Sequence, residues 1–147
     1  MTAWQVLAAG AQTTVQDQGR HGWRHLGVAR AGALDTSALA VANLLVGNDE
    51  TAAGLEMALQ GPRLRLPRAC RIALTGAPVP AWWNHVPLPA GRPHDLPAGE
   101  LRFGTLRDGL RAWLAIAGGI ATPSVLGSRS TDLRGGFGGL EGRALLT

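Results

Sequence analysis

Polar side chains that could bind or transform a substrate gather between Gly10 and Gly32, where Gln16, Asp17 and Arg20 lie close together. Amide and carboxylate groups can bind the edge of a urea-like or lactam-like molecule, and an arginine can hold an anion. We therefore take Gln16 and Arg20 as substrate-binding candidates and Asp17 as a catalytic candidate. The structural alternative is an Asx-type turn with a surface salt bridge.

Two histidines of the same stretch, His21 and His25, lie four residues apart. On a helix this spacing could ligate a metal, but Gly22 would interrupt the helix and Arg24 is an unfavourable neighbour for a cation. We therefore expect no metal here. His25 is a candidate acid–base group, because imidazole titrates near neutral pH.

Glu56 lies on a predicted strand and faces away from Leu55 and Met57. It is either a solvated carboxylate or a carboxylate in a cleft, paired with an arginine. The second interpretation makes it a further catalytic candidate.

A second polar cluster is Ser128-Arg129-Ser130-Thr131. It is not a nucleophile elbow, which requires Gly-x-Ser-x-Gly between a strand and a helix. An arginine, hydroxyls and nearby glycine amides suit anion binding instead, so Arg129, Ser130 and Thr131 are substrate-binding candidates. The alternative is a hydrogen-bonded hinge between domains, and both interpretations can hold together.

Short strands and one helix must position these side chains. Leu34, Ala38, Val41 and Leu45 form one apolar face, which predicts a helix from an N-cap at Asp35 to about residue 47. Alternating apolar residues separated by turn signals predict a mainly β fold, a closed or half-closed barrel. The predicted strands cover residues 4–8, 55–59, 63–66, 71–75, 101–103 and 110–117. The polar stretch 10–32 is either a functional loop or a pair of short strands.

The chain divides into a predicted barrel domain, residues 1–117, and a glycine-rich connecting segment, residues 118–147. This segment is too polar for a core strand. We expect it to be exposed, to lead toward a second domain that the sequence does not contain, and to pack on another copy or on a partner subunit.

Composition excludes several functions. All fourteen basic residues are arginine, so a P-loop lysine, a Schiff base and a lysine general base are excluded. The arginines are dispersed, which disfavours nucleic-acid binding. No apolar run approaches the roughly 18 residues of a membrane helix. The single cysteine, Cys70, is expected to be a small buried hydrophobe, and the chain to be cytoplasmic.

Three stretches together resemble a known family, that of the bacterial 5-oxoprolinase C subunit, allophanate hydrolase subunit 2 and the carboxyltransferase region of urea carboxylase, also called biotin-dependent carboxyltransferase-like. The resemblance covers essentially the whole chain, as the N-terminal half of a family member. It rests on residues 13–20 with Gly27-Val28 and residues 32–35; on residues 43–48 with Leu55-Glu56 and Gly61-Pro62; and on residues 118–120, 126–131 and 138–143.

The resemblance implies two cyclophilin-like β-barrels in tandem, of which this chain matches the first. It implies a B subunit and an A subunit as partners, with a homo-oligomer as a further possibility. In the 5-oxoprolinase branch the complex uses ATP to open 5-oxoproline to glutamate. In the urea carboxylase branch biotin donates a carboxyl group to urea. In a third branch the homologue antagonises an inhibitor of a histidine kinase.

Overall fold

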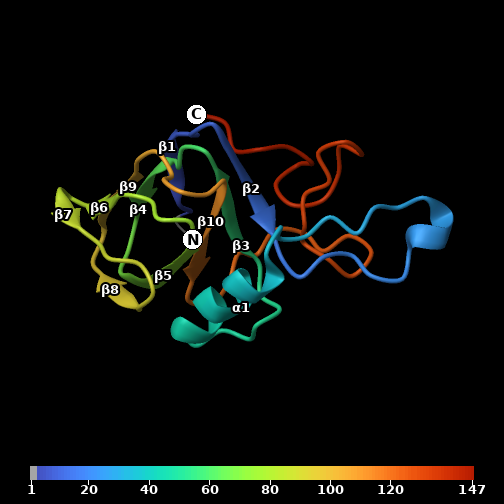
Figure 1. Cartoon of the computed structure of the whole chain (residues 1–147), viewed down its shortest axis with the longest axis horizontal. Coiled ribbons are helices and arrows are strands. Elements are labelled where there is room, and N and C mark those ends of the chain that lie inside the picture. The colour runs from blue at the N-terminus through green and yellow to red at the C-terminus, as the bar shows by residue number, and fades with distance from the viewer. Residues whose placement is uncertain (1–2) are drawn as a thin grey trace.

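The computed structural model describes residues 3–147, and these contain ten β-strands, one α-helix and one short 3-10 turn (Figure 1). The mainly β prediction with one principal helix is confirmed. The strands form two five-stranded antiparallel sheets, in the orders β1-β4-β9-β6-β7 and β2-β3-β10-β5-β8. The first sheet contains β1 (Gln5–Ala8), β4 (Arg63–Leu66), β9 (Gly99–Phe103), β6 (Ala81–Trp83) and β7 (Val86–Pro87). The second contains β2 (Gln12–Gln16), β3 (Gly54–Ala58), β10 (Arg111–Ile116), β5 (Cys70–Gly76) and β8 (His94–Leu96).

The main core lies between the two sheets. Leu64 and Leu101 of the first sheet and Leu55, Ile72 and Leu114 of the second are all at most 5% exposed and belong to one apolar cluster. Alternation along each strand places these side chains on the inner faces. Burial of apolar surface of this kind is the main force that holds the sheets together.

The single helix, α1 (Thr36–Leu45), covers the outer face of β5 and β10. Its predicted N-cap is confirmed, because the Asp35 carboxylate accepts a hydrogen bond of 3.0 Å from the Ala38 amide. The predicted apolar face is confirmed only in part. Ala38 and Leu45 are half-buried and pack against buried clusters. Leu34 and Val41 are 72% and 50% exposed, and the residues that the helix buries are Leu39, Ala42 and Asn43.

The helix presents this face to the protein because Asn43 makes hydrogen bonds on its buried side. The Asn43 side-chain amide donates to the Ala52 carbonyl at 2.8 Å, and its oxygen accepts from the Asn48 amide at 3.1 Å. Asn48 in turn donates to the Ile116 carbonyl at 2.8 Å. The helix thus turns a hydrogen-bonding residue toward the sheet and leaves leucine and valine in solvent.

Polar stretch 10–32 contains β2, so part of it is a strand. Although β2 has the sequence Gln-Thr-Thr-Val-Gln, all of it except Gln12 is buried, because β3 pairs with it on one side and later chain segments cover it. The short strands β6, β7 and β8 were also absent from the prediction. Polar or two- to three-residue strands carry little periodic signal.

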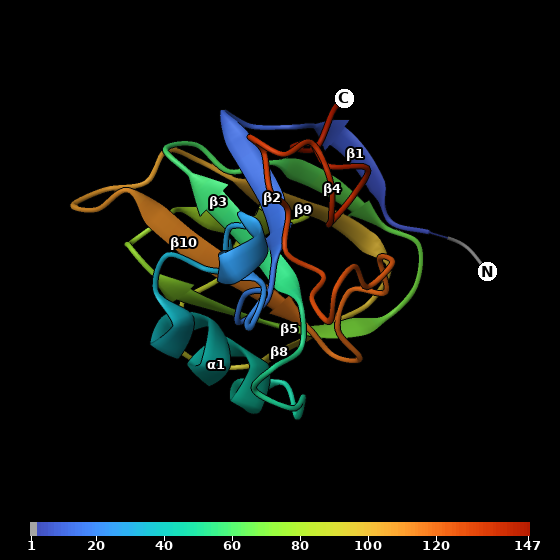
Figure 2. The ribbon, with the colours of Figure 1, turned by 90° about the vertical axis from the view of Figure 1, so that its right-hand side faces the viewer.

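The chain after β10 forms no further helix or strand, but it folds back onto the sheets. Leu145 is 7% exposed within the main core, and its amide donates to the Thr13 carbonyl at 2.8 Å. Figure 2 shows this orange-to-red segment beside β2 and β4. The segment is therefore not the exposed tail that we expected, whereas the domain boundary at residue 117 stays a prediction. Across residues 3–147, no helix is long and apolar enough to cross a bilayer.

Candidate functional site

The predicted site residues Asp17, Ser130 and Arg129 meet where the end of β2 contacts the segment after β10. One Asp17 carboxylate oxygen, Oδ1, accepts hydrogen bonds from the hydroxyls of Ser128 at 2.7 Å and Ser130 at 2.6 Å, and from the Gly19 amide at 2.9 Å. The other, Oδ2, accepts from the backbone amide of Arg129 at 2.7 Å. We call these five residues the polar joint.

The polar joint keeps Asp17 ionised. Burial of the carboxylate would raise its pKa, but the hydrogen bonds from Ser128, Ser130 and the two backbone amides outweigh burial and lower the pKa below its ordinary value of 3.8. A carboxylate that is saturated with donors is a poor proton acceptor. The geometry therefore gives Asp17 the means to fix two segments against each other.

Arg20 lies beside the joint and is 2% exposed. Its Nε donates to the Val125 carbonyl at 2.8 Å and one terminal nitrogen donates to the Ser130 carbonyl at 3.0 Å. The guanidinium also lies 4.8 Å from the centre of the Phe137 ring, a cation–π contact. A Cβ at Gly138 would collide with the Ser130 carbonyl, so glycine is needed for this close approach. Most of the arginine fork is thus engaged by the chain itself.

Gln16 and Thr131 also join β2 to the segment after β10. The Gln16 amide donates to the Thr14 hydroxyl at 3.0 Å and to the Thr131 carbonyl at 3.3 Å, and its oxygen accepts from the Gly32 amide at 3.1 Å. The Thr131 hydroxyl donates to the Val15 carbonyl at 2.9 Å. Both side chains are buried and hydrogen-bonded within the chain.

Arg129 differs from the other members because its side chain is exposed. Its backbone is held by Asp17, and its Nε donates to the Thr122 carbonyl at 2.8 Å. Within residues 3–147 the two terminal nitrogens make no hydrogen bond and no ion pair. A cationic group with a fixed backbone and an unoccupied planar end can receive a carboxylate or a phosphate.

His25 belongs to an arm, residues 18–32, that extends away from the sheets (Figure 1). At the base of the arm, the Arg20 amide donates to the Arg30 carbonyl at 2.6 Å and joins the two sides of the arm. Nearer the tip, the Trp23 indole donates to the Leu126 carbonyl of the segment after β10 at 3.1 Å. The tip is the 3-10 turn η1 (Arg24–Leu26), where His25 is exposed. Within residues 3–147, no hydrogen bond joins His25 to the residues of the polar joint.

Glu56 faces α1, not the joint. Its Oε2 accepts from the Leu34 amide at 2.8 Å and from the Trp113 indole at 3.1 Å, while Oε1 lies 3.5 Å from Nε of Arg111. The carboxylate is paired with an arginine, as one interpretation proposed, and its side chain is 12% exposed. These contacts place it at the entry to the helix.

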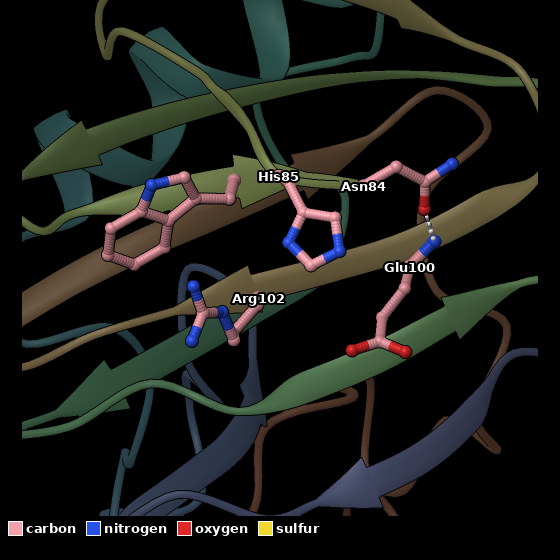
Figure 3. Close-up of a pocket in the computed structure, with 5 residues that line it drawn as sticks. Asn84, His85, Glu100 and Arg102 are labelled. Atoms are coloured by element: carbon pink, nitrogen blue, oxygen red, sulfur yellow. Dashed lines mark hydrogen bonds between the residues drawn. The ribbon is translucent and has the colours of Figure 1, made fainter.

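Two hollows were not predicted from the sequence. The first, about 360 Å³, is lined by Trp82, Asn84, His85, Glu100 and Arg102, with the Arg102 guanidinium 4.5 Å from the centre of the Trp82 ring (Figure 3). The second, about 770 Å³ and mainly apolar, opens between the sheets and the segment after β10. Both draw residues from distant strands, which is why sequence spacing did not reveal them.

Of the eight side chains predicted for a site, the structure therefore gathers six around the polar joint: Gln16, Asp17, Arg20, Arg129, Ser130 and Thr131. His25 and Glu56 lie elsewhere. Ser128 was seen only as part of the second cluster, although its hydroxyl is a direct partner of Asp17. The serines alternate as Ser-x-Ser, and this spacing is the signal that could have identified it.

The chain is similar to known proteins in both sequence and fold. The chain is 46% identical over 142 residues to the 5-oxoprolinase C subunit of Escherichia coli, a match that covers 96% of this chain and 46% of that protein. It is 40% identical over 145 residues to urea amidolyase of Lachancea kluyveri, covering 97% of this chain and 8% of that protein. The chain thus spans about half the length of the first relative and a small part of the second.

The solved structure of Kluyveromyces lactis urea carboxylase superimposes with a TM-score of 0.95 at 40% identity, over 97% of this chain and 13% of that one. The family model for the carboxyltransferase domain, subdomain A and B, matches residues 26–147. The match takes in the second half of the arm, the helix, the strands from β3 to β10 and the whole segment after β10. The chain therefore belongs to the carboxyltransferase domain family, subdomain A and B.

Proposed function

We propose that this chain works as part of a 5-oxoprolinase, an ATP-dependent enzyme that opens the lactam of 5-oxoproline to give glutamate. The observation that carries the proposal is the 46% identity to the Escherichia coli 5-oxoprolinase C subunit over 96% of the chain. That protein is about twice as long, so the complete activity requires more than these residues.

The proposed partners are the A and B subunits of such an enzyme, with self-association as a further option. ATP is the proposed cosubstrate of the complex. A chain without lysine cannot supply the P-loop lysine of a Walker site, so ATP would bind to a partner or by another mode. A lone half-buried cysteine suits a reducing compartment, and we propose the cytoplasm.

Within this assignment, Arg129 is the residue that we propose to hold the carboxylate of 5-oxoproline. Its backbone is fixed by Asp17, whereas the end of its side chain is exposed. Gln16, Arg20, Ser130 and Thr131 lie in or beside the joint, and their hydrogen bonds within the chain support positioning more directly than substrate contact. One terminal nitrogen of Arg20 is buried and has no hydrogen-bond partner among the described residues. Direct substrate binding by these four side chains stays a prediction.

Catalytic roles for Asp17, His25 and Glu56 also stay predictions. The four donors on Asp17 favour a positioning role. Exposure of His25 at the arm tip would let it reach a site that a partner completes. Glu56 is held by a backbone amide, an indole and an arginine, so catalysis by it requires one of these contacts to open.

The test is a reconstituted complex with its A and B subunits, assayed for ATP hydrolysis that depends on 5-oxoproline. A charge-assisted contact contributes ~1.5–3 kcal/mol, so Arg129→Ala should lower activity or 5-oxoproline affinity at least about tenfold. Arg134→Ala, another exposed arginine of the same segment, is the matched control and should change neither. Normal assembly with unchanged kinetics in Arg129→Ala would make the segment a hinge, and failed assembly would make Arg129 structural.

A second function has a specific observation in its favour. The TM-score of 0.95 to Kluyveromyces lactis urea carboxylase supports a role in carboxyl transfer from biotin to a urea-like acceptor. The same purified complex separates the two proposals. ATP-dependent carboxylation of urea with a biotin carboxylase, and no response to 5-oxoproline, would favour carboxyl transfer. None of these relatives is named for an action on a kinase inhibitor.

A further inference from the structure

The second hollow is built like a small-molecule site. It has a volume of about 770 Å³, within the range of roughly 300–1,000 Å³ typical of ligand pockets. It lies between the sheets, with Val6 of β1 and Leu64 of β4 on one side and Val15 of β2 and Leu55 of β3 on the other. Residues 119–122, Leu140 and Leu145 of the segment after β10, which passes beside both sheets in Figure 2, form a further part of the wall. The remaining lining residues are 3–4, 68–70, 116 and 117.

Charge in this hollow has one sign. Among the described residues, 3–147, Arg68 is the only charged residue of its lining, which contains no aspartate and no glutamate. Arg68 is exposed and has no ion pair within residues 3–147. The remaining lining residues are mainly aliphatic, with one tryptophan, Trp4. A ligand with an apolar body and a single anionic end matches this arrangement, whereas a cation or a dianion does not.

Thr122, a half-buried residue, belongs to the same lining. The Thr122 carbonyl holds Nε of Arg129, which fixes the backbone at this point.

We propose that this hollow binds an organic monocarboxylate with an apolar body, such as a medium-chain aliphatic acid, with the carboxylate at Arg68 and the chain between the two sheets. This site adjoins the proposed 5-oxoproline site but does not include Arg129, whose Nε contacts Thr122 of the lining. 5-Oxoproline has a short polar ring that would leave most of the apolar wall uncovered, so it should not compete.

Cys70 makes the site measurable, because it lines the hollow and is the only cysteine of the chain. Calorimetric titration of the purified chain with octanoate, 1-octanol and 5-oxoproline is the first measurement. We expect octanoate to bind and to slow alkylation of Cys70 by N-ethylmaleimide, 1-octanol to bind more weakly, and 5-oxoproline to do neither. Absence of octanoate binding, or binding that leaves Cys70 unprotected, overturns the proposal.

Variants then test the two halves of the ligand separately. Arg68→Gln should weaken octanoate about five- to tenfold and leave 1-octanol unchanged, because the ion pair is partly screened by solvent. Arg65→Gln removes the same charge from an exposed residue of β4 outside the lining and should have no effect. Equal octanoate affinity in Arg68→Gln and the unaltered chain contradicts the assigned carboxylate position.

Ala121→Trp, at an exposed residue of the lining, should fill the hollow and abolish binding of both octanoate and 1-octanol. The other occupant to consider is a second copy of the chain. If sedimentation shows a dimer that Ala121→Trp dissociates, and octanoate does not bind, the hollow is an interface between copies and the proposal is wrong. Binding of octanoate to a chain whose assembly state does not change supports it, whichever way the 5-oxoprolinase assay turns out.

Discussion

At the scale of single residues, Asp17 decides how the segment after β10 meets the sheets. Replacement by asparagine keeps the size but brings an NH₂ group toward hydroxyl and amide donors. We expect Asp17→Asn to lower the free energy of unfolding by about 2–4 kcal/mol, measured by urea denaturation at neutral pH. Asp108→Asn, at an exposed residue with φ of 51°, is the control and should change little, because asparagine accepts this backbone conformation.

The pH dependence of stability, compared between the unaltered chain and Asp17→Asn, gives a second prediction. The folded pKa of Asp17 is below its ordinary value of 3.8, so its stabilising effect is fully present above about that pH. It is lost as the pH falls through the folded pKa. The stability difference between the unaltered chain and Asp17→Asn should therefore be constant from pH 5 to 7 and shrink below about pH 4. A difference that stays constant to pH 2.5 would contradict an ionised, hydrogen-bonded Asp17.

Cys70 allows a third prediction at this scale. Burial raises the pKa of its thiol from 9.0 to about 11. The folded state then holds its proton more tightly than the unfolded chain, so stability from this group is present below pH 9 and lost between about pH 9 and 11. Without lysine or tyrosine, few other groups titrate there. Thiolate absorbance at 240 nm should rise near pH 11 in the folded chain and near pH 9 in denaturant, and one shared midpoint would refute the shift.

At the scale of elements, the cap of α1 is the simplest to test. The Asp35 carboxylate accepts from the Ala38 amide, and loss of such a cap costs about 1 kcal/mol. Asp35→Ala should destabilise the chain by that amount, whereas Asp35→Asn, which retains an acceptor, should be close to neutral. Thermal unfolding followed by circular dichroism measures both. Equal effects of the two variants would mean that the negative charge, and not the hydrogen bond, matters.

Elements also show where sequence reasoning succeeds. The strands β3, β4, β9 and β10 were predictable because their apolar residues alternate or run together and glycine or proline separates them. The helix was predictable at its ends but not in its rotation. Apolar spacing favoured Val41, whereas the amide network of Asn43 and Asn48 directs a different face to the sheet. Sequence alone does not show which polar residue will find buried partners.

The candidate site, like the helix, could be predicted from the sequence only in part. Residues near position 17 and near position 129 were each recognisable as polar clusters in glycine-rich surroundings. Their union was not predicted, because it depends on how the segment after β10 folds back onto β2. Nor was the apolar hollow, which needs Val6, Val15, Leu55 and Leu64 from four different strands to meet. Contacts distant in sequence leave no periodic pattern along the chain.

At the scale of the whole molecule, large apolar side chains are exposed on separate elements. Leu26 at the tip of the arm is 64% exposed, Leu34 just before α1 is 72% exposed and Leu44 within α1 is 59% exposed. Exposed apolar surface is a common feature of interfaces. The chain also covers only 46% of the length of the Escherichia coli 5-oxoprolinase C subunit. Both observations lead to an expectation about the catalytic activity of the purified chain alone.

We therefore expect the isolated 147-residue chain to fold but to show no ATP hydrolysis that depends on 5-oxoproline. It has no lysine for a phosphate-binding loop, and the one exposed arginine of its polar joint faces solvent. Phosphate release should remain at background with the chain alone and appear when the chain is combined with the A and B subunits. Turnover by the chain alone would show that it contains a complete active site.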